Sequence, residues 1–399
     1  MLGALVSPVL RTSSGKEHGI PSEIVIGGLF PFTGELSGFG QKYYRAAELA
    51  IEDVNRFVHE TLGLNVTFKL ITEDTGTSSS TAAKAIQSLA AKGVQVIVGP
   101  YSSRCVEAVK SYADSHRIVV VSPSSTSPAL AIPNDFIFRF VPTDVHQGKA
   151  LARLVWESGI RRVAVIYTQD PWGEGLYNAF KKYFEGLGGT VVGIGYAPEA
   201  KEHSAEVRKL ADTIKGFGTG SDVGVLMISF EDDGIDILKL ASENPTLMRV
   251  MWFGTDGTVY STKLAEQVGD IMVKLGNIPH TGYSPPDSPF SRDVNARYRA
   301  KYGEDMDPYG RTTYDAIWVI AFTILQTGRY DGSTIAKALP EVAMRFYGAS
   351  GWTALDENGD RAFGDYGIVA LKYENGKYVW EEVGVYREAT DSIVWFEGK

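Results

Sequence analysis

The sequence predicts an α/β protein with two doubly wound lobes, each built on a parallel sheet. Short Val- and Ile-rich segments alternate with segments whose apolar residues recur at helical spacing, which is typical of βαβ units. This alternation runs to about residue 144 and then restarts, so two similar units are expected. The length of 399 residues also exceeds what one compact core usually fills, and a hydrophobic content of 44% suffices for two cores.

The first unit begins with a buried strand at 24–30 and a helix at 43–58, which places Ala46 and Val54 on one face. The Gly-rich segment 31–41 between them is expected to be a loop. The other strands of this unit are β-branched runs, and the other helices begin near a hydroxyl residue that can act as a cap. These strands are expected at 66–74, 94–99 and 119–121, and the helices at 80–93 and 103–113.

The second unit repeats this order. Its strands are expected at 161–168, 190–196, 222–229 and 249–257, and its helices at 146–159, 176–188, 204–216 and 234–244. The segment 169–175, which reads QDPWGEG, is expected to be a loop. From residue 291 the chain is helical again, and it closes with a β-rich segment at 365–386.

This order suits three crossings between two lobes, with a cleft between the lobes for a ligand. The Pro- and Gly-rich segment 278–289 is expected to be a linker. We expect lobe 1 to comprise 23–140 and 279–352, lobe 2 to comprise 141–278 and 353–399, and the crossings to lie near 139–141, 277–279 and 351–353. Residues 1–22 lack the basic start of an intact signal peptide and are expected to be a leader remnant or disordered.

The composition excludes several classes of protein. There are 48 acidic and 39 basic residues, and no block of Lys or Arg stands out, so no nucleic-acid partner is expected. No window approaches about 20 uninterrupted apolar residues, so any membrane association is expected to be peripheral. The single cysteine, Cys105, excludes an internal disulfide and is expected to face a core. Asn65 begins an Asn-Val-Thr sequon, which matters only in a glycosylating compartment.

No motif indicates catalysis, a cofactor or a metal. The sequence lacks GxSxG, GxxxxGK[ST] and a GxGxxG after a strand. The six histidines form no metal-ligand pair at helical spacing, and each is expected at the surface or at a helix cap. The segment 356–367 imitates the start of a calcium loop, but Arg361 replaces the required Gly and Gly367 the required Glu, so a turn is expected.

Hydroxyl side chains follow two consecutive strands, in VIVGPYSS at 96–103 and in VVVSPSSTSPAL at 119–130. The carboxyl ends of parallel strands meet at one edge of the sheet, and the helices that follow offer unpaired N–H groups to an anion. Ser103, Ser124 and Thr126 are therefore candidates to bind the carboxylate of a small ligand. The alternative is that these hydroxyls only cap their own helices.

A second group of candidates lies at other strand ends. Asp256 follows a strand of the second unit and could receive a ligand ammonium, although an acid in a Thr-Asp-Gly segment also occurs simply as part of a turn. Aromatic residues also gather at these ends, as expected for the walls of a small-ligand cleft. They are Phe39, Tyr101, Trp172 and Phe230.

Several of these segments, in this order, resemble the leucine/isoleucine/valine-type solute-binding proteins of ABC importers. The resemblance rests on GGLFPFTGELSGFGQ, AAELAIEDVN, VIVGPYSS, VVVSPSSTSPAL, VIYTQDPWGEG, the Tyr314-Asp315-Ala316 segment and LDENGDR. It extends from about Glu23 to the C-terminus. It implies a periplasmic-binding-protein fold of type I, in which two lobes close on a small ligand.

The resemblance also implies roles for the candidate residues. The family's carboxylate-binding hydroxyl falls on Ser103, and the contacts of its SP-x-x-T loop fall on Ser124 and Thr126. The acid that pairs with the ligand ammonium falls on Asp256. The aromatic lid positions fall on Phe39, Trp172 and Phe230. Members of the family often have Glu in place of Asp256 and Tyr near the last two aromatic positions, which leaves the identity of the amino acid open.

The expected function is capture of a small amino acid or related carboxylate in the periplasm or at the cell surface, and its delivery to an ABC permease, without a cofactor or catalysis. Two alternatives remain. The aromatic residues favour a binding protein for an aromatic acid or amide, whose affinity would survive replacement of Asp256 by Asn. A cytosolic ligand-sensing regulator could use the same fold.

Overall fold

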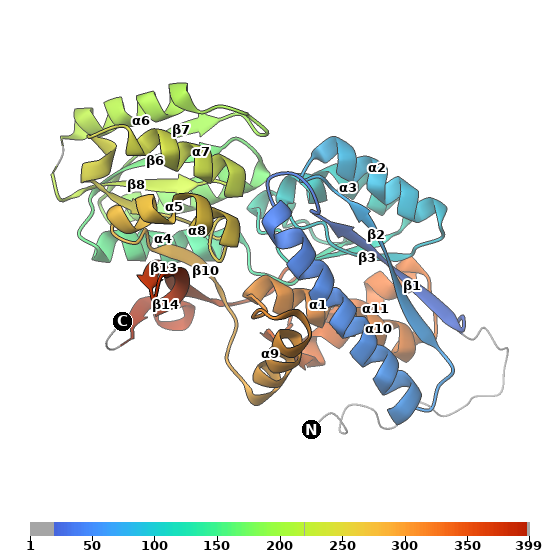
Figure 1. Cartoon of the computed structure of the whole chain (residues 1–399). Coiled ribbons are helices and arrows are strands. Elements are labelled where there is room, and N and C mark those ends of the chain that lie inside the picture. Colours follow the sequence, from blue (N-terminus) through green and yellow to red (C-terminus); the bar gives the residue numbers. More distant parts are fainter. Residues whose placement is uncertain (1–19, 219, 397–399) are drawn as a thin grey trace.

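The computed structural model describes residues 20–218 and 220–396 and shows two α/β lobes (Figure 1). Residues 1–19 of the predicted leader lie outside these ranges. The sheet of lobe 1 has the strand order β2-β1-β3-β4-β5, and all of its pairs are parallel. Its strands are β1 (Glu23–Phe30), β2 (Thr67–Asp74), β3 (Val96–Val98), β4 (Val119–Ser122) and β5 (Ile137–Arg139).

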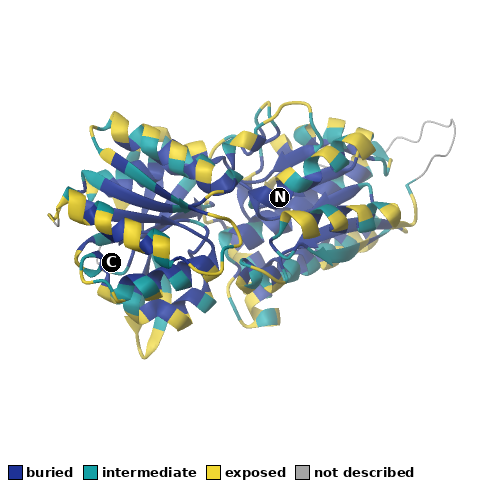
Figure 2. Cartoon of the chain, turned by 90° about the horizontal axis from the view of Figure 1, so that it is seen from above, coloured by how far each residue is buried: buried dark blue, intermediate teal, exposed yellow. Residues whose placement is uncertain are grey.

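Helices cover both faces of this sheet, so its strands lie in the buried interior of the lobe (Figure 2). Ile97 and Val120 face α2 and α3, whereas Val98 and Val121 face α1 and α10. A strand buried on both faces is apolar at every position, which explains the uninterrupted Val and Ile runs. The helices of lobe 1 are α1 (Ser37–Arg56), α2 (Ser79–Ala91), α3 (Ser103–His116), α9 (Pro289–Tyr302), α10 (Pro308–Thr327) and α11 (Gly332–Arg345).

Lobe 2 repeats this architecture with a parallel sheet of order β7-β6-β8-β9. Its strands are β6 (Arg162–Thr168), β7 (Thr190–Tyr196), β8 (Val223–Ile228) and β9 (Met251–Phe253). Helices α4 (Asp144–Glu157) and α5 (Pro171–Gly186) cover one face, and α6 (Ser204–Phe217), α7 (Glu231–Ser242) and α8 (Thr262–Lys274) cover the other. The predicted α/β class with two parallel-sheet lobes is confirmed.

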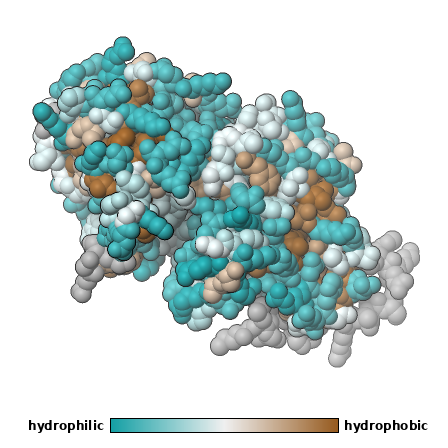
Figure 3. Space-filling model, in the orientation of Figure 1, coloured by the Kyte–Doolittle hydropathy of each residue, from teal (hydrophilic) through white to brown (hydrophobic). Residues whose placement is uncertain are grey.

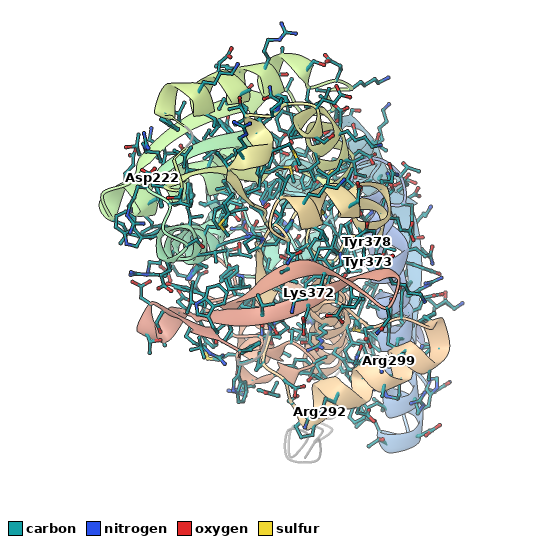
Figure 4. The ribbon with its side chains drawn as sticks, turned by 60° about the vertical axis from the view of Figure 1, so that its left-hand side comes forward. Asp222, Arg292, Arg299, Lys372, Tyr373 and Tyr378 are labelled. Carbon is teal, nitrogen blue, oxygen red and sulfur yellow. The ribbon has the colours of Figure 1, made fainter. Side chains whose placement is uncertain are left out.

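An antiparallel sheet of order β10-β13-β14-β15 extends lobe 2. Its strands are β10 (His280–Ser284), β13 (Asp365–Glu374), β14 (Lys377–Arg387) and β15 (Ser392–Trp395). Tyr373 and Tyr378 face each other near the turn of its hairpin, with ring centroids 5.0 Å apart (Figure 4). Because β10 pairs with β13, the predicted linker 278–289 is partly a strand, and the chain returns to lobe 1 after Ser284 rather than at Pro279.

Two segments that the sequence predicts to be loops contain the start of a helix. Helix α1 begins at Ser37, because the Glu231 carboxylate of the other lobe accepts a hydrogen bond from the Gly38 amide at 2.9 Å. Helix α5 begins at Pro171, because the Asp170 side chain accepts a hydrogen bond from the Gly173 amide and proline suits the first helical position. Both helices therefore begin at the side where the lobes meet.

The crossings between the lobes are joined by a buried ion pair. Arg139, at the end of β5, is fully buried and donates from Nε and Nη2 to the two carboxylate oxygens of Asp360, each at 2.5 Å. Asp360 lies in the segment that imitates a calcium loop. This segment forms a turn in which the Asp356 carboxylate accepts hydrogen bonds from the backbone amides of Asn358 and Asp360. The hairpin of β11 (Tyr347–Gly348) and β12 (Gly351–Trp352) precedes this turn.

One histidine departs from the positions predicted for the histidines, at the surface or at a helix cap. His280 is fully buried in β10 and contacts Trp380 edge-on at 5.0 Å, and burial lowers its pKa to about 4. The sequence pattern missed the burial of His280 because that burial depends on the pairing of β10 with β13, far along the chain. His203 occupies the N-cap position of α6, as the helix-cap alternative predicted, where it is 1% exposed and its Nδ1 is 2.7 Å from a carboxylate oxygen of Asp236. Cys105 is buried against the α2–α3 face of the sheet, as predicted.

Polar side chains dominate the face of the molecule shown in Figure 3, with apolar residues exposed in small separate areas. Within the described residues, no helix combines the length and the hydropathy needed to cross a bilayer.

Candidate functional site

A small, narrow cavity lies between the lobes. Lobe 1 contributes the start of α1, the loop between β3 and α3 and the loop after β4, and lobe 2 contributes the starts of α5 and α7 and the loop after β9. Seven of the eight predicted site residues line it: Phe39, Tyr101, Ser103, Ser124, Trp172, Phe230 and Asp256. Thr126 is buried beside it, and its carbonyl oxygen accepts a hydrogen bond from the Asp144 amide at 2.8 Å.

The loop between β3 and α3 is shaped by glycine. Gly99 has a φ of +90°, and a Cβ atom at this position would lie only 2.2 Å from the carbonyl oxygen of Leu29. Only glycine suits both conditions. The chain can therefore turn sharply at the end of β3, and the first residues of α3 enter the cavity.

The hydroxyls of this region do not cap α3. Ser102 occupies the cap position without a capping hydrogen bond from its side chain. The Ser103 hydroxyl is 2.9 Å from the Ser125 hydroxyl and accepts a hydrogen bond from the Ser127 amide at 3.2 Å. The alternative in which Ser103 only caps its own helix therefore does not describe this structure. Ser103 instead joins the two hydroxyl-rich loops.

The second hydroxyl loop also reaches the other lobe. Ser124 donates a hydrogen bond to the carbonyl oxygen of Tyr101 at 3.2 Å. Ser127 donates to the carbonyl oxygen of Pro171, at the start of α5, at 2.6 Å. The Thr126 hydroxyl is buried next to the Asp144 carboxyl, whose pKa it acts to lower, without a hydrogen bond of ordinary geometry.

The opposite side of the site is acidic. Asp256 accepts hydrogen bonds from Gln147 Nε2 at 3.0 Å and from the Tyr309 hydroxyl at 3.4 Å, and burial raises its pKa to about 6. Asp144 lies nearby, and its pKa is raised by burial and by the charge of Asp256. Neither carboxylate oxygen of Asp144 accepts a hydrogen bond of ordinary geometry. None of the described residues that line the cavity is a lysine or an arginine, so this side is suited to a cation.

Sequence reasoning missed Asp144, Gln147, Tyr43 and Tyr309. Asp144 and Gln147 are three residues apart at the start of α4 and therefore share one helical face, a signal that the sequence contains. Tyr43 and Tyr309 carry no such signal, because their place at the cavity depends on how α1 and α10 pack.

Aromatic rings from both lobes enclose the remaining space. In lobe 1, Tyr43 stacks between Phe39 and Tyr101, at centroid distances of 5.8 Å and 4.5 Å. In lobe 2, Trp172 and Phe230 stack at 4.5 Å. These rings exclude water from the polar groups, which strengthens the hydrogen bonds and charge interactions made there. The described residues contain no group of three or more His, Cys, Asp or Glu side chains suited to a metal ion.

Two lobes around a shared cavity with aromatic walls, hydroxyls and an acidic side define a protein that binds a small molecule. The chain belongs to the periplasmic binding protein family, since the model of that family matches residues 23–377.

Relatives cover nearly the whole chain. An uncharacterized protein of Methanocaldococcus jannaschii is 31% identical over 96% of this chain and 94% of its own length. The Leu/Ile/Val-binding protein homolog 3 of Brucella melitensis is 26% identical over 95% of this chain and 99% of its own length. The crystal structure of a leucine-binding protein, LivK, from Thermotoga maritima superposes with a TM-score of 0.77 at 23% identity, covering 91% of this chain and 98% of that one.

These comparisons give the protein a solute-binding role, because the family and its named member are binding proteins. The predicted resemblance to Leu/Ile/Val-type solute-binding proteins is confirmed.

Proposed function

We propose that the protein captures a small amino acid outside the cytoplasm and presents it to the permease of an ABC importer. The observation that carries the proposal is the division of one interlobe cavity into two chemical sides. Ser103 and Ser124 line the cavity beside the start of α3, where a helix N-terminus favours an anion. Asp256 lies on the other side, where its ionised carboxylate favours an ammonium. An α-amino acid carries both groups on one carbon atom.

The comparisons support this ligand class and this location. Relatives are named Leu/Ile/Val-binding protein and amino acid binding protein, and the family is that of periplasmic binding proteins. The aromatic walls favour a second candidate, an aromatic acid bound through its carboxylate alone.

The first experiment is thermal unfolding of the protein with each proteinogenic l-amino acid and with benzoate. If l-leucine raises the unfolding temperature, its affinity is compared by calorimetry with those of isocaproate, which lacks the ammonium, and leucinamide, which lacks the carboxylate. The same pair of analogues is used for any other amino acid that binds. We expect both analogues to bind much more weakly. Binding of benzoate or isocaproate without binding of any amino acid would replace the proposal by the aromatic or simple carboxylate candidate.

Replacing Ser103 by Ala is expected to weaken amino-acid binding by about 10- to 150-fold, since a hydrogen bond to a charged group contributes roughly 1.5–3 kcal/mol. The control is Ser115→Ala, because Ser115 is exposed on the same helix and its hydroxyl contacts only nearby residues of that helix, the carbonyl oxygen of Tyr112 and Nδ1 of His116. Calorimetric titration of both variants checks the result. Normal affinity in Ser103→Ala would show that its hydroxyl serves only to join the two loops.

Amino-acid binding is also expected to weaken on acidification below about pH 6. Burial raises the pKa of Asp256 to about 6, so its carboxyl binds a proton below that pH in the ligand-free protein. An ammonium ligand pairs with the ionised form, and each further pH unit then costs up to about tenfold in affinity. Titrations between pH 5 and 8 measure this slope. If the affinity of Asp256→Asn falls equally steeply with pH, a group other than Asp256 causes the pH dependence.

A further inference from the structure

Arg104 brings a positive charge of lobe 1 into contact with lobe 2. It follows Ser103 directly as the second residue of α3, and only 4% of its surface is exposed. Its Nε lies 3.7 Å from a carboxylate oxygen of Asp170, the cap residue of α5. Its guanidinium carbon lies 5.1 Å from the centroid of the Phe230 ring, at the cap of α7. Two helices of lobe 2 therefore meet this one side chain.

The remaining surroundings of Arg104 are acidic. Glu35, in the loop before α1, forms an ion pair with its Nη2 inside lobe 1. Burial alone would lower the pKa of Arg104, but Glu35 and Asp170 outweigh it and raise this pKa. The Nε and Nη1 atoms have no hydrogen-bond partner, so the interaction with lobe 2 consists of charge attraction and ring stacking. Such contacts form only when the lobes are together.

We propose that Arg104 is a positioning residue for the cleft, which fastens the start of α3 and its Ser103 to α5 and α7 of lobe 2 and thereby sets the balance between closed and open protein. One consequence rests on the proposed function: Arg104 would set ligand affinity without touching the ligand. The effect on closure does not rest on that function, because every contact of Arg104 described above is with protein.

Solvation of the charged groups predicts whether loss of Arg104 favours the open or the closed protein. In the closed protein, Arg104, Glu35 and Asp170 are all withdrawn from water, with exposed side-chain fractions of 4%, 12% and 2%. Removing the arginine would leave two carboxylates unpaired between the lobes, whereas opening would return both to water. The variant Arg104→Met therefore favours the open protein, although methionine keeps an apolar side chain next to Phe230. Asp170→Asn removes only the charge, since asparagine also caps helices well.

The experiment measures closure without any ligand. Lys42 of lobe 1 and Thr262 of lobe 2 lie opposite each other, with Nζ 3.2 Å from Oγ1. Lys42→Cys and Thr262→Cys, combined with Cys105→Ala, create a thiol pair that a short bis-maleimide joins only in the closed protein. The rate of crosslinking then reports the closed population even when that population is small. The matched control is Arg161→Met, whose guanidinium stacks on Trp156 at 3.6 Å entirely within lobe 2.

We expect Arg104→Met to slow crosslinking by about 5- to 30-fold, which is the change in a two-state ratio that about 1–2 kcal/mol produces. Asp170→Asn should slow it less, and the double variant should slow it by less than the product of the single effects, because the two residues share one contact. Arg161→Met should leave the rate unchanged. A rate for Arg104→Met within twofold of the parent, or an equal loss in Arg161→Met, would overturn the proposal. Far-ultraviolet circular dichroism confirms that each variant is folded.

Because no ligand enters this experiment, its result is separate from the test of the proposed function. Slower crosslinking in a protein that binds no amino acid would support the role of Arg104 in closure and refute the ligand class. Unchanged crosslinking of the Arg104 variant, in a protein that binds an amino acid tightly, would refute the role of Arg104 in closure and support the ligand class.

Discussion

Replacing Asp256 by Asn is expected to weaken amino-acid binding by about 30- to 5,000-fold, since removing one partner of a buried charge pair costs about 2–5 kcal/mol. Asparagine has almost the same shape as aspartate, and its carbonyl oxygen can still accept the hydrogen bond from Gln147. The variant therefore removes the charge and little else. The wide range reflects Asp144, which remains beside the ligand ammonium and supplies part of the attraction.

Calorimetric titration at pH 8, where the Asp256 carboxyl of the parent is ionised, measures this effect. The control is Asp270→Asn, because Asp270 pairs with Lys274 at the exposed surface of α8. The amide and acid analogues of the ligand sharpen the result: the parent and Asp256→Asn should differ little for isocaproate. Unchanged affinity for the natural ligand would instead indicate that the ligand carries no ammonium, as the aromatic-acid candidate requires.

The two-lobe architecture could be predicted because strands buried on both faces are apolar throughout and recur between amphipathic helices. The segments VIVG and VVVS became β3 and β4, and their register places Val98 beside Val121 in adjacent parallel strands. Strand ends that share an edge bring their loops together, so the proximity of Ser103 to the SPSSTSP loop also follows from the local pattern. The same logic placed Asp256 after β9, at the corresponding edge of the other sheet.

The elements that the sequence did not predict depend on contacts between distant segments. Helix α1 begins at Ser37 in a Gly-rich stretch that reads as a loop, because the carboxylate of Glu231 in the other lobe satisfies the Gly38 amide. Strand β10 lies in a Pro- and Gly-rich stretch and exists because β13 supplies its hydrogen bonds. Its burial also removes His280 from the surface. Local propensity contains none of this information.

On the acidic side of the site, too, one residue could be predicted from the local sequence and another depends on the fold. Asp256 could be recognised as a candidate from its place after a strand. Asp144 carries only the weaker signal of a helical face shared with Gln147, and an acid at the start of a helix is usually explained by the helix dipole alone. Its significance appears only when the fold buries it close enough to Asp256 for the two charges to interact.

Replacing Arg139 by Met is expected to lower the free energy of unfolding by about 3–5 kcal/mol, because it leaves the Asp360 carboxylate buried and unpaired. Arg139 has no exposed surface, and the exposed fraction of the Asp360 side chain is 2%. The guanidinium also donates from Nη1 to the carbonyl oxygen of Ser127 at 2.6 Å, so the loss extends to the hydroxyl loop of the site. The pair joins the chain as it leaves lobe 1 to the turn that follows its last crossing.

Denaturant unfolding of the ligand-free protein measures this loss, with Arg345→Met as the control. Arg345 pairs with Glu341 at 2.8 Å on the exposed face of α11, where an ion pair contributes roughly 0–1 kcal/mol. The double variant Arg139→Met/Asp360→Leu decides the mechanism, because it removes the unpaired charge while keeping apolar volume. If burial of a lone carboxylate causes the loss, the double variant should be more stable than Arg139→Met. If the double variant is as unstable as the single one, the loss comes from the arginine's bond to the Ser127 loop, and amino-acid affinity should fall equally in both.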